Sequence, residues 1–421
     1  MGSLPRVTTT PIPDLAHRAK AASRVLATAS TVCKNDALLA AADLLESRTA
    51  DVLTANASDV AAAEAAGIAP GLVDRLRLDE GRVSAMAGGL RQVATLPDPV
   101  GEVLDGWVRP NGLRISRVRV PLGVVAIIYE SRPNVTSDAA ALCLKSGNAA
   151  FLRGSSTAIH SNTAISRVLR EAVAEAGLPE DSVVLVDDTS REAAVEFMQQ
   201  RGLVDCLIPR GGASLIRTIL DHATVPYVID GDGNCHVYVD RAADLDMAQS
   251  ILVNAKTQRP SVCNAAESLV VHADVAQEFL SRVDSFLSEV ELVGDERARS
   301  IIPRAGVATD EDFAREFLAM KLSVKVVDSL DEAIAHVNAN STGHSEAIVT
   351  ADFATAERFL AEVDAAAVLV NASTRFVDGE EFGFGAEIGI STQKLHARGP
   401  MGLRQLTTAK YVVRGEGQVR G

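Results

Sequence analysis

Short apolar runs separated by amphipathic stretches dominate the chain from residue 124 onward. In the first series these runs cover residues 124–128, 149–152, 183–186, 204–208 and 225–229. Because the runs are apolar at almost every position, the corresponding strands should be buried on both faces, and segments such as 161–176 should be the helices that cover them. This alternation is typical of βαβ units in a parallel sheet.

A second series of the same kind follows Cys263. Strand-like runs alternate with helical patterns; the strands are expected at 268–271, 324–327, 347–350 and 367–370, and the helices near 274–290, 330–340 and 353–364. The expected fold class is therefore α/β, with two doubly wound parallel-sheet domains. Cys263 should lie near the junction of these domains.

The remaining segments predict helices and a small antiparallel element. Residues 14–66 are rich in Ala and Leu at helical spacing, with Asp36 as the expected cap of an apolar stripe. Residues 106–118 alternate around Asn111-Gly112, which predicts a β-hairpin with a two-residue turn. Together with strand-like residues 410–413, this hairpin offers an edge that a second subunit would cover, so we expect a homo-oligomer, a dimer or tetramer. Packing of the hairpin on its own domain is the alternative.

Composition limits the classes of function. The chain has 421 residues, of which 47% are hydrophobic and 23% charged, as in ordinary globular proteins of more than one domain. A formal net charge of −14 argues against nucleic acid as a partner, and no apolar run is long enough to cross a membrane. The first six residues lack the features of a secretory signal, so we expect a cytoplasmic protein.

The cysteines do not predict a disulfide framework or a metal site. They are odd in number and widely scattered, which fits a reducing compartment. They are Cys33, Cys143, Cys206, Cys235 and Cys263. No pair has the spacing of zinc ligands, and the neighbours Cys235 and His236 would point to opposite faces of one strand.

Cys263 is the strongest candidate for chemistry. It lies in a polar and small-residue stretch, and two cations close in sequence, Lys256 and Arg259, would favour its thiolate, the strongest side-chain nucleophile near neutral pH. A small buried thiol is the alternative, and the spacing alone leaves both open. A cysteine that attacks a carbonyl also needs an oxyanion donor, and Asn134, after the strand at 124–128, is the candidate; a turn asparagine is the alternative.

Three glycine-rich or cationic strand ends suggest a cofactor crevice. Arg210-Gly211-Gly212 lies between a strand and a helix, where unpaired amides and the helix dipole favour a phosphate. Gly231-Asp232-Gly233 and Arg153-Gly154 follow two other strands. If these ends meet, a dinucleotide would lie across them, and Arg153 and Arg210 would take a ribose phosphate, which favours NADP over NAD. Each glycine pair alone is also explained by a tight turn.

Five blocks of sequence resemble one known family. They read VPLGV with YESRPNVT (120–136), LCLKSGN (142–148), GNCHVYVD (233–240), RPSVCNAAE (259–267) and GAEIGISTQKLHARGPMGL (385–403). With these blocks the chain resembles the aldehyde dehydrogenase superfamily over nearly its whole length. The resemblance implies an NADP-binding Rossmann-like domain at 1–104 and 120–233 and a catalytic domain at 234–400. Residues 105–119 and 401–421 would form the oligomerisation hairpin and C-terminal strand.

The resemblance also implies an activity. It is the NADPH-dependent reduction of L-glutamate 5-phosphate to L-glutamate 5-semialdehyde, with release of phosphate, through a thioester on Cys263 in proline biosynthesis. By the same resemblance, Arg153 would contact the adenosine ribose, Gly211 and Gly212 the pyrophosphate, and Glu316 the nicotinamide ribose. A kinase that forms glutamyl phosphate, glutamate 5-kinase, would be a functional partner.

One departure from the family bears on the reaction. Hydrolytic members use a glutamate to activate water in the loop that here covers 228–233, and this loop has no glutamate, although Asp230 and Asp232 are available. A phosphorylating reaction must exclude water from the thioester, so the missing base agrees with it. A hydrolytic aldehyde dehydrogenase and a catalytically silent binding subunit are the alternatives. Arg132, His396 and Arg398 are candidates for substrate binding, with surface positions as the alternative.

Overall fold

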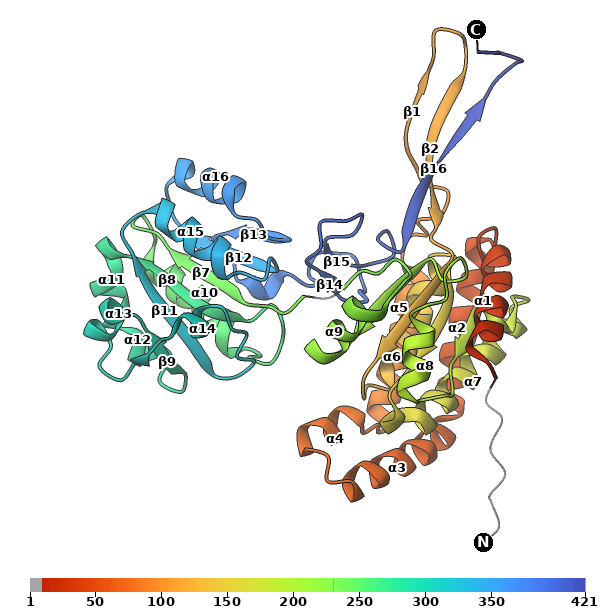
Figure 1. Ribbon diagram of the computed structural model, residues 1–421, viewed down its shortest axis with the longest axis horizontal. Helices are drawn as coiled ribbons and strands as arrows, with labels where there is room; N and C mark the ends of the chain where they lie inside the picture. The colour runs from red at the N-terminus through yellow and green to blue at the C-terminus, as the bar shows by residue number, and fades with distance from the viewer. Residues whose placement is uncertain (1–9, 230, 421) are drawn as a thin grey trace. The chain divides into compact units, whose positions relative to one another are not determined.

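The computed structural model describes residues 10–229 and 231–420, which form two compact units. Unit 1 comprises the described residues up to Ile229, Phe384–Gly389 and the described residues from Met401 onward. Unit 2 comprises residues 231–383 and Ile390–Pro400. Figure 1 labels helices and strands of each unit.

Unit 1 is built from nine helices among the described residues, two short 3₁₀ turns and seven strands. The helices are α1 (Ile12–Leu26), α2 (Thr31–Ser47), α3 (Thr49–Ala65), α4 (Pro70–Leu76), α5 (Glu80–Thr95), α6 (Asn134–Lys145), α7 (Ile159–Glu175), α8 (Arg191–Phe197) and α9 (Ala213–His222). The strands are β1 (Val103–Val108), β2 (Arg114–Pro121), β3 (Val124–Tyr129), β4 (Ala149–Arg153), β5 (Val183–Leu185), β6 (Cys206–Arg210) and β16 (Thr407–Arg414), and the 3₁₀ turns are η1 (Ser156–Ala158) and η2 (Glu180–Ser182).

The core of unit 1 is a parallel sheet of four strands in the order β5-β4-β3-β6. All six residues of β3 are buried, as expected of a central strand covered on both faces. Helices α1 and α6 pack on β3 and β4, and α2, α3 and α5 form a further layer on α6 and α7. The sheet order places the carboxyl ends of β4 and β6 on either side of β3.

A second, antiparallel sheet of unit 1 has the order β1-β2-β16, and it extends away from the parallel sheet (Figure 1). Strand β16 pairs with β2 from Thr407 opposite Pro121 to Arg414 opposite Arg114. The predicted hairpin is confirmed, but its turn is longer than two residues: Val108 pairs with Arg114, so the loop runs from 109 to 113. Gly112 supplies the positive φ of 89° that this loop needs.

Unit 2 contains the following elements. The helices are α10 (Leu245–Thr257), α11 (Ala273–Leu280), α12 (Val283–Phe286), α13 (Glu296–Ile301), α14 (Asp310–Phe313), α15 (Leu330–Asn340) and α16 (Phe353–Glu362), with η3 (Thr374–Phe376). The strands are β7 (Cys235–Val239), β8 (Ala266–His272), β9 (Glu291–Gly294), β10 (Gly306–Val307), β11 (Lys321–Val327), β12 (Ser345–Val349), β13 (Ala367–Val370), β14 (Ile390–Ser391) and β15 (Gly399–Pro400).

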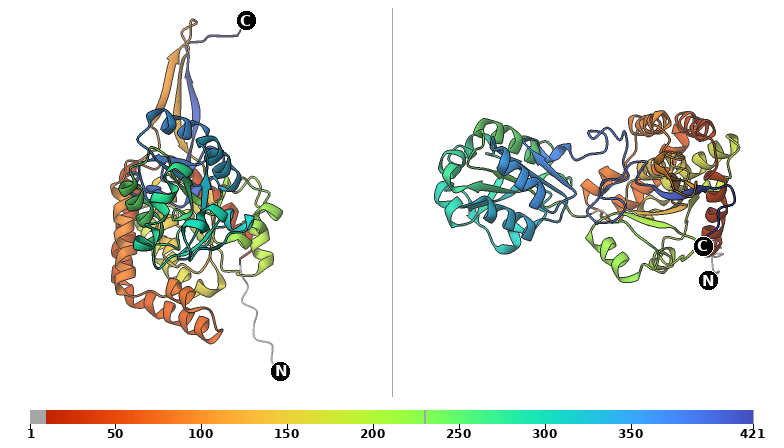
Figure 2. Two further views of the ribbon diagram at one scale, coloured as in Figure 1. Left: turned by 90° about the vertical axis from the view of Figure 1, so that its left-hand side faces the viewer. Right: turned by 90° about the horizontal axis from the view of Figure 1, so that it is seen from above.

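Seven parallel strands form the main sheet of unit 2, in the order β10-β9-β11-β8-β7-β12-β13. Helices lie on both faces of this sheet (Figure 2). Successive residues of a strand enter different cores: Val237 and Val239 pack with α10 and α11, whereas Tyr238 packs with α15 and α16. This period of two puts helices on both faces, so the sheet is doubly wound. Two parallel α/β sheets with a small antiparallel element were the expected fold class, which is confirmed.

Most predicted elements are confirmed, and besides the length of the hairpin turn two further details are wrong. Helix α15 and strand β13 have the expected bounds of 330–340 and 367–370. Helix α2, however, begins at Thr31, because the Ser30 side chain accepts the N–H of Cys33 and caps it, so Asp36 is not a cap. Residues 225–229 form only one isolated bridge, between Tyr227 and Leu207. Pro226 lacks an N–H and cannot donate to a strand ladder; its carbonyl only accepts the N–H of Leu207.

Three further observations concern the described part of the chain. No helix there is long and apolar enough to cross a membrane. Its His, Cys, Asp and Glu side chains form no group of three or more that could hold a metal ion. Cys235 and His236 contact different groups, as expected of neighbours on one strand: Cys235 Sγ lies near the carbonyl of Cys263, and His236 Nδ1 lies 2.9 Å from Glu346 Oε2.

Candidate active site

Cys263 lies in the loop between α10 and β8, and its side chain is half-buried. The backbone of Gly233 lies against this loop: a Cβ at position 233 would be 1.6 Å from the carbonyl oxygen of Cys263. That carbonyl also accepts a hydrogen bond from Cys235 Sγ at 3.2 Å. Gly233 therefore supports the loop of Cys263 within unit 2, whereas Gly231 packs on Thr392. Asp230, a candidate base in the sequence, lies outside the described residues.

Glu316 is connected to the same loop through Gly233. Its Oε1 atom accepts the N–H of Gly233 at 2.8 Å. Burial raises the pKa of the Glu316 carboxyl group, and the hydrogen bond from Gly233 acts in the opposite direction. Glu316 is thus hydrogen-bonded to Gly233, the glycine that contacts the Cys263 loop. The separation of these residues in the sequence does not reveal this contact.

A buried ion pair lies beside this loop. Lys256 Nζ is 2.6 Å from Glu267 Oε2, and both side chains are fully buried. Burial raises the pKa of Glu267 to about 7 and lowers the pKa of Lys256. The other Glu267 oxygen accepts the N–H of Leu318 at 3.1 Å. Sequence proximity suggested Lys256 as a cation for the thiol, but its ammonium group pairs with Glu267 instead.

The structure brings Arg375, which the sequence analysis missed, to the loop of Cys263. Arg375 belongs to η3, which follows β13, and η3 is attached to Asn264 on both sides: Thr374 Oγ1 donates to the Asn264 carbonyl at 2.7 Å, and Asn264 Nδ2 donates to the Val377 carbonyl at 3.0 Å. Arg375 Nε donates to Gln258 Oε1 at 2.8 Å. The available signal was its position just after a parallel strand, where ligands bind in α/β sheets.

Three histidines lie on or beside β7, and two of them, His336 and His344, were missed from the sequence. His236 and Glu346 form a fully buried pair, and the His236 ring packs edge-on to His336 with centroids 5.8 Å apart. His344 Nδ1 lies 2.7 Å from Ser345 Oγ and 3.9 Å from Cys235 Sγ. Burial lowers the pKa of His336 and of His344 to about 4, so both rings are neutral at pH 7.

In unit 1 the predicted cofactor residues lie at one edge of the parallel sheet. Arg153 pairs with Ile128 and Arg210 with Tyr129, so both arginines stand at carboxyl ends that flank β3. Arg153 Nη2 donates to the Ser190 carbonyl at 2.6 Å, while its buried Nε has no partner among the described residues. Burial lowers the pKa of Arg153.

The Gly211-Gly212 turn before α9 already holds a carboxylate. Glu130 Oε1 accepts the N–H of Gly212 at 3.1 Å, and a Cβ at Gly211 would lie 2.8 Å from the same oxygen. In this structure the anion at the Gly212 amide is the side chain of Glu130.

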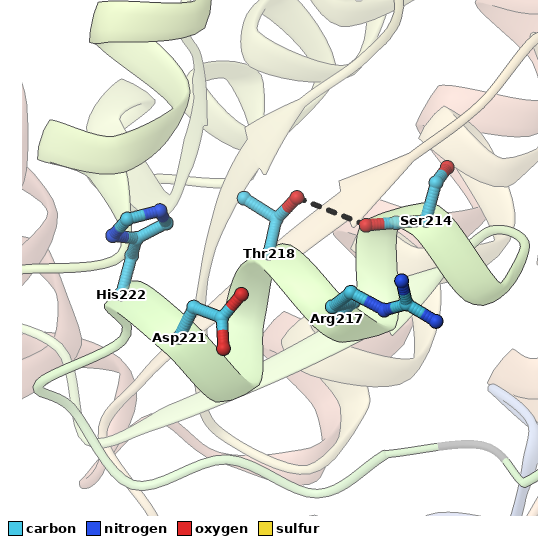
Figure 3. Close-up of a pocket in the computed structure, with 5 residues that line it drawn as sticks. All are labelled: Ser214, Arg217, Thr218, Asp221 and His222. Carbon is cyan, nitrogen blue, oxygen red and sulfur yellow. Dashed lines mark hydrogen bonds between the residues drawn. The ribbon is translucent and has the colours of Figure 1, made fainter.

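Beyond this turn, a hollow of about 320 Å³ follows the exposed face of α9 (Figure 3). All five lining residues come from α9, namely Ser214, Arg217, Thr218, Asp221 and His222. Thr218 Oγ1 donates to the Ser214 carbonyl, so this hydroxyl is used within the helix. The hollow is therefore a feature of the α9 surface, and no other helix or strand of the described chain contributes a lining residue.

Asn134 and the candidate substrate residues lie mostly at the surface. Asn134 is the first residue of α6, and its Nδ2 donates to Asp138 Oδ2 at 2.8 Å. Burial raises the pKa of Asp138 to about 6. Arg132 and His396 are exposed. Arg398 Nη2 donates to Asp364 Oδ1 at 2.9 Å, in a surface ion pair that includes Lys394.

The comparisons with known proteins agree on one family. Residues 1–303 and 305–412 match the model of the aldehyde dehydrogenase family. Relatives named gamma-glutamyl phosphate reductase include one from Moorella thermoacetica, 58% identical over 406 residues, which are 96% of this chain and 97% of the relative. Another, from Carboxydothermus hydrogenoformans, is 58% identical over 410 residues, which are 97% of this chain and 99% of the relative.

A solved structure gives the same result. The crystal structure of gamma-glutamyl phosphate reductase from Thermotoga maritima matches with a TM-score of 0.96 and 49% identity, over 98% of this chain and all of that chain. An acetylating aldehyde dehydrogenase from Geobacillus thermoglucosidasius, at 18% identity and a TM-score of 0.66, shares the fold. This chain therefore belongs to the aldehyde dehydrogenase family.

Proposed function

We propose that this chain reduces L-glutamate 5-phosphate to L-glutamate 5-semialdehyde with NADPH and releases phosphate, as a step of proline biosynthesis. The observation that carries the proposal is the identity of 54–58%, over nearly full length, with relatives named gamma-glutamyl phosphate reductase. That name states both an acyl phosphate substrate and a reduction. The chain is accordingly a phosphorylating aldehyde dehydrogenase.

Cys263 is the group that holds the acyl moiety between the two halves of the reaction. Its thiolate attacks the acyl carbon, the bond from that carbon to the phosphate oxygen breaks, and phosphate leaves with the electron pair and takes up a proton. The acyl group remains on Cys263 as a thioester. Bound NADPH supplies the hydride that reduces it. The adduct on Cys263 then releases the aldehyde and restores the thiolate.

Both steps place negative charge on the former carbonyl oxygen, which needs hydrogen-bond donors. The N–H of Cys263 is one candidate donor, and Asn134 is the proposed side-chain donor. One Nδ2 hydrogen of Asn134 serves Asp138, which leaves the second for a ligand. The contact with Asp138 also orients the amide group.

The residues at the edge of unit 1 fit a polar cofactor. Arg153 Nε and Asn162 Nδ2 are buried without a partner among the described residues. The Asn162 amide packs directly on the backbone of Gly154, where a Cβ would lie 2.0 Å from Nδ2. Arg153 and Arg210 would hold the ribose phosphate of NADP, and the amides of Gly211 and Gly212 the pyrophosphate. Glu316 would hold the nicotinamide ribose.

Substrate, partner and assembly assignments belong to the same proposal. Arg132, His396 and Arg398 are the proposed cations or donors for the carboxylate and amino groups of the glutamyl substrate. The sheet β1-β2-β16 has exposed apolar side chains, among them Trp107 and Tyr411, and would pair subunits in a homo-oligomer. Functional coupling to glutamate 5-kinase and a cytoplasmic location complete the proposal.

The test uses the reverse reaction, with glutamate 5-semialdehyde and NADP. NADP reduction is expected to require phosphate or arsenate and to disappear in Cys263→Ala. Full activity without either oxyanion, with direct formation of the acid, would identify the hydrolytic alternative. A catalytically silent subunit would show no NADP reduction and a Cys263 thiol no more reactive toward iodoacetamide than a model peptide.

A further inference from the structure

Arg375 is held in a fixed position next to the nucleophile loop. Its backbone segment is attached to Asn264, the residue after Cys263, by the Thr374 and Val377 contacts described above, both of which are buried. Its side chain is oriented by Gln258, the C-cap residue of α10, which accepts from Nε at 2.8 Å. The guanidinium group of Arg375 is thus anchored between the end of α10 and the loop of Cys263.

Charges gather around this guanidinium group. The thiols of Cys263 and Cys235 and the side chains of Asp378 and Arg259 are all close enough to influence Arg375 electrostatically. Burial is the main cause that lowers the pKa of Arg375; Asp378 and Cys263 act in the opposite direction, and Arg259 lowers the pKa further. The Arg259 side chain is exposed, so solvent weakens this repulsion. A phosphate that contacts both guanidinium groups would be stabilised by the two charges together. Asp378 is the charged side chain with the largest effect on Arg375, and its Oδ1 also accepts the N–H of Glu380 at 2.9 Å.

We infer that Arg375, assisted by Arg259, binds the phosphate group of the acyl phosphate and the phosphate ion that it becomes, next to Cys263. The inference rests on the proposed function and adds to it the residues that hold the leaving group. Guanidinium groups suit this task, because their planar N–H donors match phosphate oxygens. Arg375 is half-buried, so its charge is less screened than a surface charge.

The proposed phosphate subsite acts on the bond between the acyl carbon and the phosphate oxygen. When the Cys263 sulfur bonds to the acyl carbon, the carbon–oxygen bond to phosphate breaks and negative charge grows on that oxygen. Arg375 stabilises this charge in the forward direction. In the reverse direction it places inorganic phosphate against the thioester. In the absence of turnover, inorganic phosphate bound at Arg375 would lie beside the Cys263 thiol and shield it from reagents.

The decisive measurement is protection of Cys263 from alkylation by inorganic phosphate, which does not depend on turnover. The rate of iodoacetamide labelling of Cys263, read by peptide mass spectrometry, is followed against phosphate concentration at constant ionic strength. Phosphate is expected to slow labelling of the wild type. Arg375→Gln should need at least tenfold more phosphate for half-protection, and Arg375→Lys should recover part of the effect. Arg358→Gln, a surface arginine of the same unit, should match the wild type.

Steady-state kinetics provide the second readout. In the reverse reaction Arg375→Gln should raise the KM for phosphate at least tenfold with little change in the KM for NADP. Arg259→Gln should raise the phosphate concentration for half-protection several-fold. Because the Arg259 side chain is exposed, this variant should fold, and it provides the test if Arg375→Gln does not fold.

The possible outcomes separate this inference from the proposed function. Equal phosphate protection in wild type and Arg375→Gln overturns the inference, as does absence of protection in the wild type. A shifted pH profile of labelling with unchanged phosphate dependence also overturns it, because Arg375 would then act on the thiol alone. If phosphate protects through Arg375 but the reverse reaction does not need phosphate, the oxyanion site stands and the proposed reaction is wrong.

Discussion

Gly233 and Cys263 approach each other so closely that no side chain fits between their backbones. A Cβ at position 233 would lie 1.6 Å from the carbonyl oxygen of Cys263 and 2.6 Å from its Cα. Gly233→Ala must therefore displace the loop that carries the nucleophile. Because a shift of about 1 Å can lower a catalytic rate about 100-fold, we expect a loss of that order in kcat, measured with semialdehyde and NADP.

A matched glycine distinguishes this contact from a general effect of alanine. Gly88 lies on the exposed face of α5, and a Cβ there meets nothing within 4 Å. Gly88→Ala should keep full activity and raise stability by about 0.5–1 kcal/mol, because alanine favours a helix over glycine. Retained activity in Gly233→Ala would contradict the proposed importance of the close contact.

The buried pair of Lys256 and Glu267 should tolerate loss of both charges better than loss of one. Lys256→Met leaves the Glu267 carboxylate buried without its cation, and we expect a loss of about 3–5 kcal/mol in unfolding free energy. The double variant Lys256→Met/Glu267→Gln should be less destabilised, since an amide oxygen still accepts the N–H of Leu318. Urea unfolding of the double variant and of both single variants, Lys256→Met and Glu267→Gln, measures this difference, and additive losses would argue against coupling.

His344 should make the protein acid-sensitive. Its folded-state pKa of about 4 lies below the ordinary value of 6.5, so the unfolded chain binds the proton more readily. The stabilisation is thus present above pH 6.5 and is lost as the pH falls toward 4, by about 3 kcal/mol in total. His344→Gln should flatten the decline of the urea midpoint between pH 7 and pH 4.5, whereas His17→Gln, at an exposed position of α1, should not. Parallel curves for wild type and His344→Gln would contradict this assignment.

Glu130 should oppose cofactor binding. Its carboxylate occupies the Gly212 amide that we propose for the pyrophosphate, so the two anions compete. Glu130→Gln removes one negative charge, and a gain of about 1 kcal/mol, or about fivefold in Kd for NADPH, is expected. Fluorescence titration of NADPH measures it, with Glu180→Gln, a distant surface variant of unit 1, as the control. A weaker affinity in Glu130→Gln would instead indicate that Glu130 supports the loop.

The sequence predicted the features that depend on local pattern. The apolar runs at 124–128 and 367–370 gave strands because a parallel strand is buried on both faces, and β3 is buried throughout. The turn at Asn111-Gly112 was recognised, but its length depends on the register of the flanking strands. The run at 225–229 was misread because its apolar character outweighed Pro226, which cannot donate to a ladder.

Features that depend on contacts between distant residues could not be predicted. Arg375 reaches Gln258 across 117 residues, and η3 reaches Asn264 across 110, so no spacing rule connects them with Cys263. Lys256 was assigned to the thiol by proximity in sequence, whereas a buried ammonium group pairs with the nearest buried carboxylate, that of Glu267. The occupation of the Gly212 amide by Glu130 likewise joins two loops 82 residues apart.

The pairing of β16 with β2 has a consequence for the nascent chain. Strand β2 pairs with β1 on one edge, and on the other edge all eight of its positions pair with residues 407–414. The Asn148 side chain donates to the carbonyl of Leu406. Residues 231–383 of unit 2 are contiguous and leave the ribosome earlier. During synthesis the main sheet of unit 2 can therefore assemble before residues 407–414 are available to pair with β2. A messenger truncated before codon 407 would yield a chain in which that edge of β2 stays unpaired.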